Sequence, residues 1–242
     1  MTPETYRFAN GVTLFRHMLL DVQLARYQEP GNPNLHEPEE EAWLERLLER
    51  CGTDEPIFID IGAGVGYYSI LVKQRHPLAR VLAIEPLSAH ADAIVAHAAL
   101  NGLDDGAIEV RTNAISSHAG MSEFVPLHYG SHLKSAGKTG RPGATINVPT
   151  ITLADLMADV GAAADVVKLD IQGSELEVLA AVPDLLASGR IRSLIVGTHG
   201  PALFEGVRTL LAARYDLLHA DPAPAFQPDG LIVACHRSPA PR

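Results

Sequence analysis

The sequence has 242 residues, of which 47% are hydrophobic and 20% charged, and this balance predicts a folded globular chain rather than a disordered one. Its net charge of −10 argues against nucleic acid and anionic membrane surfaces as partners, because an acidic protein has no favourable electrostatic attraction to a polyanion. The two cysteines, Cys51 and Cys235, are too few for a disulfide scaffold or a multi-thiolate metal site. The sequence shows no bilayer-spanning apolar run and no signal-peptide pattern, so we expect a cytoplasmic protein.

The first 50 residues predict a cap and a helix ahead of the main unit. Residues 1–36 hold short apolar pieces, and the cluster 30–33 (PGNP) predicts a turn or linker. A helix is expected from Pro38, since proline suits the first helical position and the acidic residues 39–41 suit the positive end of the helix dipole. We therefore divide the chain into an N-terminal cap and helix, residues 1–50, and a single globular unit, residues 51–242.

In the main unit, short apolar runs alternate with helical patterns. Buried strands are predicted at 57–61, 80–85, 108–110, 166–170 and 192–196. Helices are predicted over 68–75, from Ser88 to a stop at Asn101-Gly102, after the capping pairs Thr152/Asp155 and Ser174/Glu177, and over 202–214. Residues 122–125 are a strand candidate, 128–143 a long loop, and 217–220 with 231–235 a closing strand pair. This alternation predicts an α/β fold, a mostly parallel sheet with helices on both faces.

Ligands of such sheets bind at the carboxyl ends of the strands, which makes the strand-end residues the first functional candidates. These residues are Asp60, Glu85, Asn113, Asp170 and His199.

A glycine-rich turn with Gly62, Gly64 and Gly66 follows the first of these strands. A tight turn without a ligand is one interpretation, and dinucleotide binding is another. The dinucleotide fingerprint is incomplete, because Tyr67 stands where its third glycine belongs, and Asp60 would repel a pyrophosphate. S-adenosylmethionine carries an ammonium and a sulfonium and no phosphate, so the turn favours that cofactor over NAD. Glu85 lies about 20 residues further on, where an acid hydrogen-bonds ribose hydroxyls; a solvated carboxylate is the alternative.

The sequence resembles the FkbM-type S-adenosylmethionine-dependent methyltransferases from about His36 to His199. The resemblance rests on the segments 58–69 (FIDIGAGVGYYS), 83–86 (AIEP), 101–103 (NGL), 113–116 (NAIS), 152–156 (TLADL) and 167–179 (VKLDIQGSELEVL). The last segment is the most specific, because general methyltransferases lack its Lys168/Asp170/Gly173/Glu175 block. The family usually has Asn where Gly64 stands and often Glu where Gln172 stands, so Gln172 cannot be the general base.

The resemblance implies a Rossmann-like class I methyltransferase, with a seven-stranded, mostly parallel sheet whose last strand is antiparallel. For S-adenosyl-L-methionine we expect a cofactor site made of Asp60, Gly62, Gly64, Gly66, Tyr67, Glu85, Pro86, Asn113, Ala114 and Asp170. The expected catalytic residues are Asp170, His199 and Lys168, and the expected acceptor-binding residues are His132, Gln172, Glu175 and His199.

Three of these residues also have a structural interpretation. Asp170 could be a helix-capping carboxylate, Lys168 could form a structural ion pair, and Glu175 could begin a helix, where the helix dipole favours an acid. His199 is a general-base candidate, because histidine titrates near neutrality. Asp170, Glu175 and His199 also suit a metal ion, although no ligand spacing demands one.

The expected reaction is methyl transfer to a hydroxyl of a small molecule, such as a secondary metabolite or sugar. Carboxyl O-methylation is the near alternative; an NAD-linked oxidoreductase and a non-catalytic binding protein of the same fold are more distant ones. The loop 128–143, which contains His128 and His132, is predicted to be an acceptor-side lid that is mobile without ligand. A homo-oligomer is left open.

Overall fold

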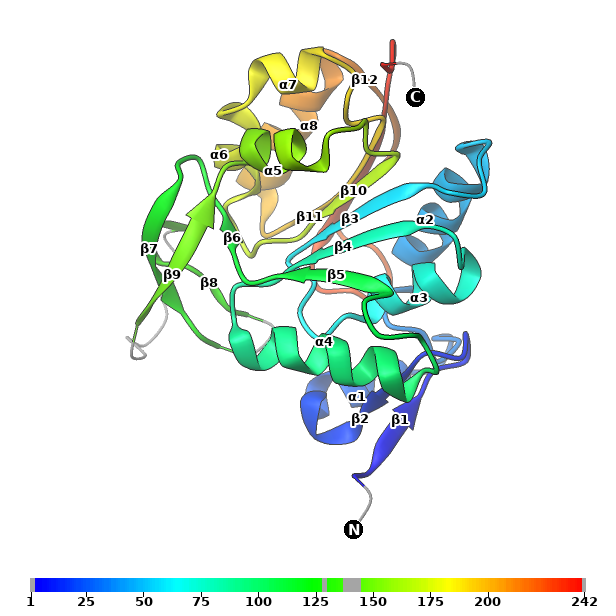
Figure 1. The fold of residues 1–242 in the computed structure, drawn as a ribbon. Helices are drawn as coiled ribbons and strands as arrows, with labels where there is room; N and C mark the ends of the chain where they lie inside the picture. Colours follow the sequence, from blue (N-terminus) through cyan, green and yellow to red (C-terminus); the bar gives the residue numbers. More distant parts are fainter. Residues whose placement is uncertain (1–2, 128–129, 137–144, 241–242) are drawn as a thin grey trace.

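A computed structural model describes residues 3–127, 130–136 and 145–240, and its centre is a seven-stranded sheet (Figure 1). Across the sheet, the strands run in the order β12 (Tyr215–Asp221), β13 (Gly230–His236), β11 (Ser193–Thr198), β10 (Val166–Leu169), β3 (Ile57–Ile61), β4 (Arg80–Ile84) and β5 (Ile108–Arg111). Strand β13 is antiparallel to both of its neighbours, and the other neighbouring pairs are parallel. The predicted mostly parallel sheet with an antiparallel last strand is confirmed.

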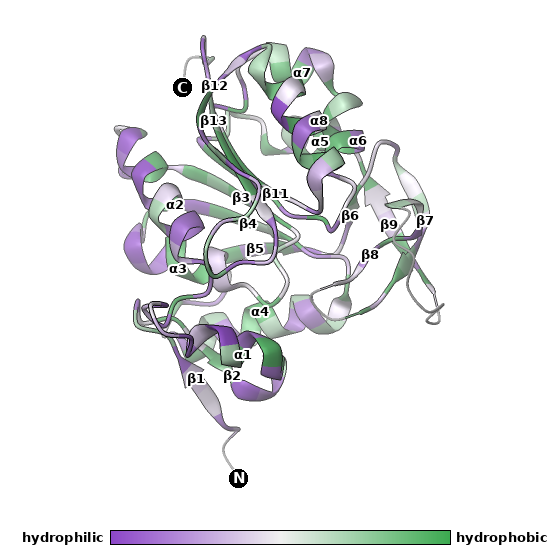
Figure 2. Cartoon of the chain, turned by 180° about the vertical axis from the view of Figure 1, so that it is seen from behind, coloured by the Kyte–Doolittle hydropathy of each residue, from purple (hydrophilic) through white to green (hydrophobic). Residues whose placement is uncertain are grey.

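Helices cover both faces of this sheet (Figure 1). One apolar core joins it to α2 (Pro38–Arg50), α3 (Tyr67–Arg75) and α4 (Ser88–Leu100). A second core joins it to α5 (Leu153–Val160), α6 (Glu175–Ala180), α7 (Pro183–Ala187) and α8 (Pro201–Ala212). Figure 2 shows the central strands largely in hydrophobic colours between these two layers. Strand β3 has β4 on one side and the later strand β10 on its other side, so the order of the strands reverses at β3. Ligands of such sheets bind at this topological switch point.

The N-terminal segment, for which the sequence predicts little, forms a hairpin of β1 (Thr5–Arg7) and β2 (Thr13–Phe15), a short 3₁₀ turn (Arg16–Met18) and α1 (Asp21–Tyr27). Its apolar side chains Phe8, Val12, Leu14 and Tyr27 are buried in the same core as α3 and α4. The division into residues 1–50 and 51–242 stays a prediction.

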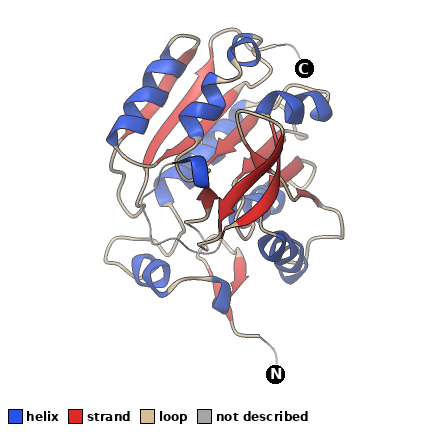
Figure 3. Ribbon diagram, turned by 90° about the vertical axis from the view of Figure 1, so that its left-hand side faces the viewer, coloured by secondary structure: helices blue, strands red, loops and turns tan. Residues whose placement is uncertain are grey.

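A second, four-stranded sheet lies beside the main one, and Figure 3 shows the molecule from the side on which this smaller sheet lies. Its strands follow the order β6 (Ala114–Ile115), β9 (Ile146–Ile151), β7 (Gly120–Val125) and β8 (His132–Leu133), with a 3₁₀ turn at Lys134–Ala136. The strand predicted at 122–125 is confirmed within β7. Strand β9 was not predicted, because Pro149 interrupts a run in which only Val148 and Thr150 are buried.

The predicted helix boundaries are correct in part. Thr152 and Asp155 form the predicted capping box, and the helix ending at Leu100 is followed by Gly102 at φ 75°. The other two caps are wrong: Ser88 lies inside α4, and Ser174 makes no capping hydrogen bond. Glu177 instead accepts a hydrogen bond from Ser117. None of the helices in the described ranges is long and apolar enough to cross a membrane.

Candidate active site

The glycine turn between β3 and α3 is tightly packed against the end of β10. Gly62, Gly64 and Gly66 have φ values of 79°, 56° and 89°, in the left-handed region that favours glycine. A Cβ atom on Gly62 would lie 1.9 Å from the backbone oxygen of Asp170, and one on Gly66 would lie 3.0 Å from Ile94. The backbone directly after β10 therefore approaches the turn so closely that only glycine fits at position 62.

Glu85, at the end of β4, is held by the backbone around it. Its carboxylate accepts hydrogen bonds from the backbone N–H groups of Gly64 at 3.0 Å and Leu87 at 3.0 Å, and the side chain is only 6% exposed. The Nδ1 atom of His90 lies 3.5 Å from Oε1. These contacts fix the orientation of an acid that borders the turn, as a ribose-binding role requires.

A cavity of about 420 Å³ opens at the carboxyl ends of the strands, within the size range of small-molecule sites. Its wall contains nine of the predicted site residues: Gly62, Gly64, Glu85, Pro86, Asn113, Ala114, Asp170, Gln172 and His199. The rest of the wall includes apolar side chains of β3, β4 and the small sheet, such as Ile61, Ile84, Phe124 and Leu133. The wall of the cavity is therefore mixed, with charged side chains such as Glu85, Asp170 and His199 beside apolar ones.

Asp60 lies below this cavity rather than in its wall. It lines a smaller adjoining cavity of about 50 Å³ together with Gly62, Gly64, Lys168 and Asp170. Its Oδ2 accepts a hydrogen bond from the Ser69 hydroxyl at 2.7 Å, whereas its buried Oδ1 has no hydrogen-bond partner among the described residues. Burial raises the pKa of this carboxyl, with Lys168 opposing the rise.

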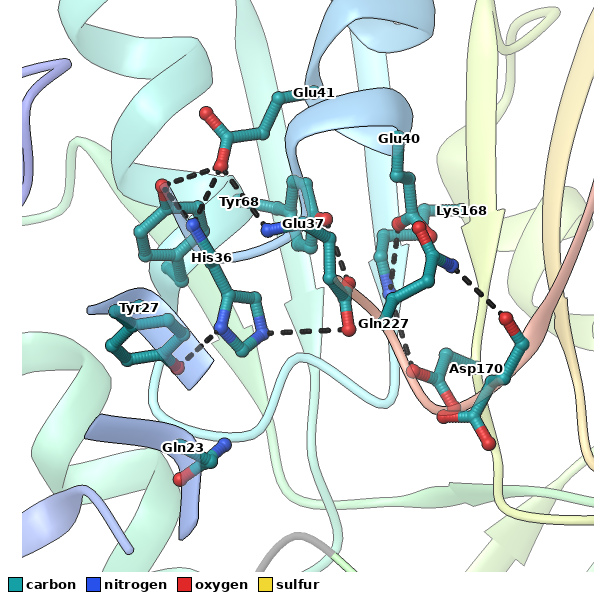
Figure 4. Close-up of polar contacts among 12 residues, drawn as sticks. Gln23, Tyr27, His36, Glu37, Glu40, Glu41, Tyr68, Lys168, Asp170 and Gln227 are labelled. Atoms are coloured by element: carbon teal, nitrogen blue, oxygen red, sulfur yellow. Dashed lines mark hydrogen bonds and ion pairs between the residues drawn. The ribbon is translucent and has the colours of Figure 1, made fainter. Parts of the chain in front are cut away.

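The contacts of Lys168 favour the structural alternative, an ion pair between neighbouring elements, over a catalytic role. Its Nζ lies 3.5 Å from Glu40 Oε1, 3.6 Å from Asp170 Oδ2 and 4.7 Å from the ring centre of Tyr68 (Figure 4). The side chain is 4% exposed and outside the larger cavity. Although burial alone would lower it, the neighbouring carboxylates raise its pKa, so Lys168 stays charged and cannot act as a base.

A charged cluster in the wall of the larger cavity is organised around His199, which follows β11. Its Nδ1 lies 3.1 Å from Glu175 Oε1, and its Nε2 lies 3.3 Å from Asp229 Oδ1 and 3.6 Å from Asp170 Oδ1. Burial opposes the charge on His199, but the three carboxylates overcome it and raise the pKa to about 10. Burial likewise opposes the charge on Asp170, but Lys168 and His199 hold its pKa below the usual range.

Glu175 is the first residue of α6, and its contacts favour the structural alternative over acceptor binding. The carboxylate accepts hydrogen bonds from the backbone N–H groups of Ile171 at 3.0 Å and Gly173 at 3.0 Å and is fully buried, outside the cavity wall. It closes the turn that carries Gln172, whose φ of 60° is unusual for a residue other than glycine. Gln172 donates a hydrogen bond to Asp170 Oδ1 at 3.1 Å and does line the cavity.

Two other predicted site residues lie outside the wall of the larger cavity, although Tyr67 lines the smaller one. The Tyr67 hydroxyl donates to Glu41 at 2.7 Å and accepts from Asn10 at 2.8 Å, so it ties α3 to the N-terminal segment. His132 is buried in β8, with Nδ1 2.8 Å from the Gly130 oxygen, whereas its neighbours Ser131 and Leu133 line the cavity. His128 and residues 137–143 of the predicted lid lie outside the described residues, so the lid stays a prediction.

The N-terminal segment contributes cavity residues that the sequence did not reveal. His36 and Glu37 line both cavities, and Gln23 and Arg26 of α1 line the larger one. His36 Nδ1 lies 2.6 Å from the Tyr27 hydroxyl (Figure 4), and burial lowers the pKa of the imidazole. The only sequence signal for these residues was that the family resemblance begins at His36.

The order of the strands and a glycine-lined crevice at their carboxyl ends define a Rossmann-like class I methyltransferase. The Methyltransferase FkbM domain matches residues 60–217, and the chain belongs to this family. The family membership favours methyl transfer over the oxidoreductase and binding-protein alternatives.

Individual relatives are distant. Methyltransferase sdnD of Sordaria araneosa is 27% identical over 191 residues, covering 65% of this chain and 71% of the relative. The structure of an FkbM methyltransferase from Methylobacillus flagellatus matches with a TM-score of 0.54 at 16% identity, over 75% of this chain and 44% of that one. This chain therefore matches less than half the length of that protein. An O-methyltransferase of Bacillus cereus, solved with S-adenosylhomocysteine, matches with a TM-score of 0.49 at 15% identity, over 82% and 80% of the two chains.

The cofactor of the family is S-adenosylmethionine, and the residues of this chain fit it. The unpartnered Asp60 Oδ1 offers a negative partner for the ammonium, and the oriented Glu85 carboxylate suits the ribose hydroxyls. The backbone of Asp170 lies so close to Gly62 that the turn has no space for a side chain at this position.

Proposed function

We propose that the chain transfers a methyl group to a hydroxyl oxygen of a small molecule, such as a secondary metabolite or sugar. When bound, S-adenosylmethionine supplies an electrophilic methyl group on a sulfonium. The protein must then hold the acceptor in line with that group and help to remove the hydroxyl proton. The observation that carries the proposal is the charged cluster in the cavity wall, where Asp170, Asp229 and His199 meet.

The acids of this cluster discriminate among acceptor classes. A carboxylate acceptor would face the like charges of Asp170 and Asp229. An amine there would be held as an ammonium, because neighbouring carboxylates raise its pKa, and an ammonium is not a nucleophile. A neutral hydroxyl avoids both problems, since it can donate a hydrogen bond to either carboxylate.

We propose a general base other than His199, the candidate from the sequence. With a pKa of about 10, His199 is protonated at neutral pH and acts as a hydrogen-bond donor rather than a proton acceptor. His36 is the better candidate, because it lines the cavity and burial keeps its imidazole neutral. In this proposal Asp170 and Gln172 orient the acceptor, and His36 accepts its proton.

Arg26 is proposed as the partner of the carboxylate of S-adenosylmethionine. It is the one arginine or lysine in the described wall of the larger cavity, and its Nε is buried without a hydrogen-bond partner in the described structure. We expect Arg26→Ala to weaken S-adenosylhomocysteine binding about 10–100-fold, the loss of roughly 1.5–3 kcal/mol for a charge-assisted hydrogen bond. Methylthioadenosine, which lacks the amino-acid group, should bind both proteins equally. An equal loss for both ligands would contradict the assignment.

The acceptor class can be tested with a metabolite extract of the native host, separated into acidic, neutral and basic fractions. Each fraction is incubated with the enzyme and methyl-labelled S-adenosylmethionine, and labelled products are detected by mass spectrometry. Asp170→Asn is the low-activity control. We expect the labelled products in the neutral fraction. Products confined to the acidic or basic fraction would contradict hydroxyl methylation.

A further inference from the structure

A bulge in the edge strand β12 turns two potential metal ligands toward α2. The pairing with β13 shifts between Leu217 and His219, so that two steps along β12 match one step along β13. Because side chains of a regular strand alternate between its two faces, the extra residue moves His219 and Asp221 to the face opposite Leu217. Leu217 packs into the core that includes α8, whereas the ring centre of His219 lies 5.5 Å from that of Trp43 in α2.

Three ligand atoms meet on this face, because Glu39 in the first turn of α2 lies opposite the strand. Its Oε1 is 3.1 Å from His219 Nε2. Asp221 supplies a carboxylate oxygen, and the three ligand atoms all lie within 4.8 Å of one another. Two ligands on opposite sides of one ion are about 4.2 Å apart, twice a bond of about 2.1 Å, so small side-chain movements bring all three into one coordination shell.

The imidazole nitrogen of this group makes no hydrogen bond. His219 Nε2 is shielded from solvent and has no hydrogen-bond partner within the described part of the chain, although Glu39 is close. A buried polar atom in this state is costly unless something else binds it. Imidazole nitrogens are the commonest metal ligands in proteins, so a cation is the binding partner that the surrounding carboxylates favour.

We propose that Glu39, His219 and Asp221 bind a divalent first-row cation, with Zn²⁺ as the representative ion. One imidazole nitrogen with two carboxylate oxygens is a donor set that Zn²⁺ accepts. All three side chains are half-buried, which leaves the fourth position of a tetrahedral ion to water. None of the three residues lines either cavity of the candidate active site, so the ion is a structural one.

The ion ties α2 to the edge of the main sheet. Strand β12 is the outermost strand of that sheet, and its other neighbour in space at this point is the first turn of α2. The same turn carries Glu40, which pairs with Lys168 beneath the cofactor site. An ion that binds the folded chain stabilises it by mass action, so Zn²⁺ raises the Tm.

The test is a titration of the metal-stripped full chain with Zn²⁺, measured by equilibrium dialysis and by thermal unfolding. We expect His219→Gln to weaken binding at least about 10-fold, because loss of a residue that merely orients a metal ligand already costs that much. The matched control is His76→Gln. His76 Nε2 is also buried without a hydrogen-bond partner and lies 4.0 Å from Glu45 of α2, but it belongs to no group of three ligands in the described ranges. This control should bind Zn²⁺ like the unmodified protein.

Absence of binding at millimolar Zn²⁺ would overturn the proposal, as would unchanged affinity in folded His219→Gln or an equal loss in His76→Gln. Circular dichroism shows whether each variant is folded. Should His219→Gln not fold, Asp221→Asn decides, because it keeps the shape of the side chain and removes its charge; unchanged Zn²⁺ affinity in that variant refutes the site. Zn²⁺ binding is measured without cofactor or acceptor, so its outcome is independent of the proposed function.

Discussion

The close approach of β10 to the glycine turn predicts a large effect for Gly62→Ala. Position 62 has φ 79°, and its new Cβ would lie 1.9 Å from the backbone oxygen of Asp170. Gly102 is the matched control, because its φ is 75° and nothing lies within 4 Å of its Cβ position. Both substitutions carry the left-handed backbone cost of about 1–2 kcal/mol and the same change in the unfolded chain. Their difference therefore isolates the contact with β10.

For that contact we expect Gly62→Ala to lose about 1–3 kcal/mol more free energy of unfolding than Gly102→Ala, the usual cost of overpacking. The backbone must also move at Gly62, which separates Asp60 and Asp170 from their positions beside the turn. Affinity for S-adenosylhomocysteine should therefore fall in Gly62→Ala and stay unchanged in Gly102→Ala. Denaturant unfolding and calorimetric titration measure the two effects. Equal stability and equal affinity in both variants would refute the packing argument and the role of the turn.

Three further expectations concern titratable residues. Glu85→Gln should weaken S-adenosylhomocysteine binding about 10–100-fold, and calorimetry would contradict the ribose role if the control Glu109→Gln, in the neighbouring strand β5, weakened it equally. The raised pKa of His199 contributes stability that is fully present below its unfolded pKa of about 6.5 and is lost as pH rises through about 10. Unfolding experiments should show that the free energy of unfolding falls by up to about 1.4 kcal/mol per pH unit between these values. An equal fall in His199→Gln would assign the effect to another group. His36→Gln should lower kcat about 10²–10⁴-fold with cofactor affinity near wild type; unchanged kcat would remove His36 as the base.

The strand-end candidates could be predicted because parallel strands bring their carboxyl ends to one edge. Glu85, Asp170 and His199 follow different strands, yet the structure places them around a single cavity, as expected from this rule. Asp60 follows the rule in sequence but lies beneath the turn, because its side chain points toward Ser69 of α3. The periodicity that identifies a strand does not resolve such a difference in depth.

The rest of the site depends on contacts between distant segments. Asp229 lies in the connection between β12 and β13, and it reaches His199 only because β13 pairs with β11. His36 and Arg26 come from a segment without strong periodicity, which is placed by burial of its own aromatic side chains against α3. The raised pKa of His199 likewise depends on three neighbouring carboxylates, Asp170, Glu175 and Asp229, and the sequence alone did not show that they meet at this residue.

The most direct test of hydroxyl methylation is the chemical environment of the transferred methyl group. A product formed from ¹³C-methyl-labelled S-adenosylmethionine is isolated and examined by carbon–proton correlation NMR, which distinguishes a methyl ether from a methyl ester and from methyl groups on nitrogen, sulfur or carbon. The proposed function, which rests on the carboxylates of Asp170 and Asp229 in the cavity wall, predicts a methyl ether. A labelled methyl ester, or a label on nitrogen, sulfur or carbon, would contradict it.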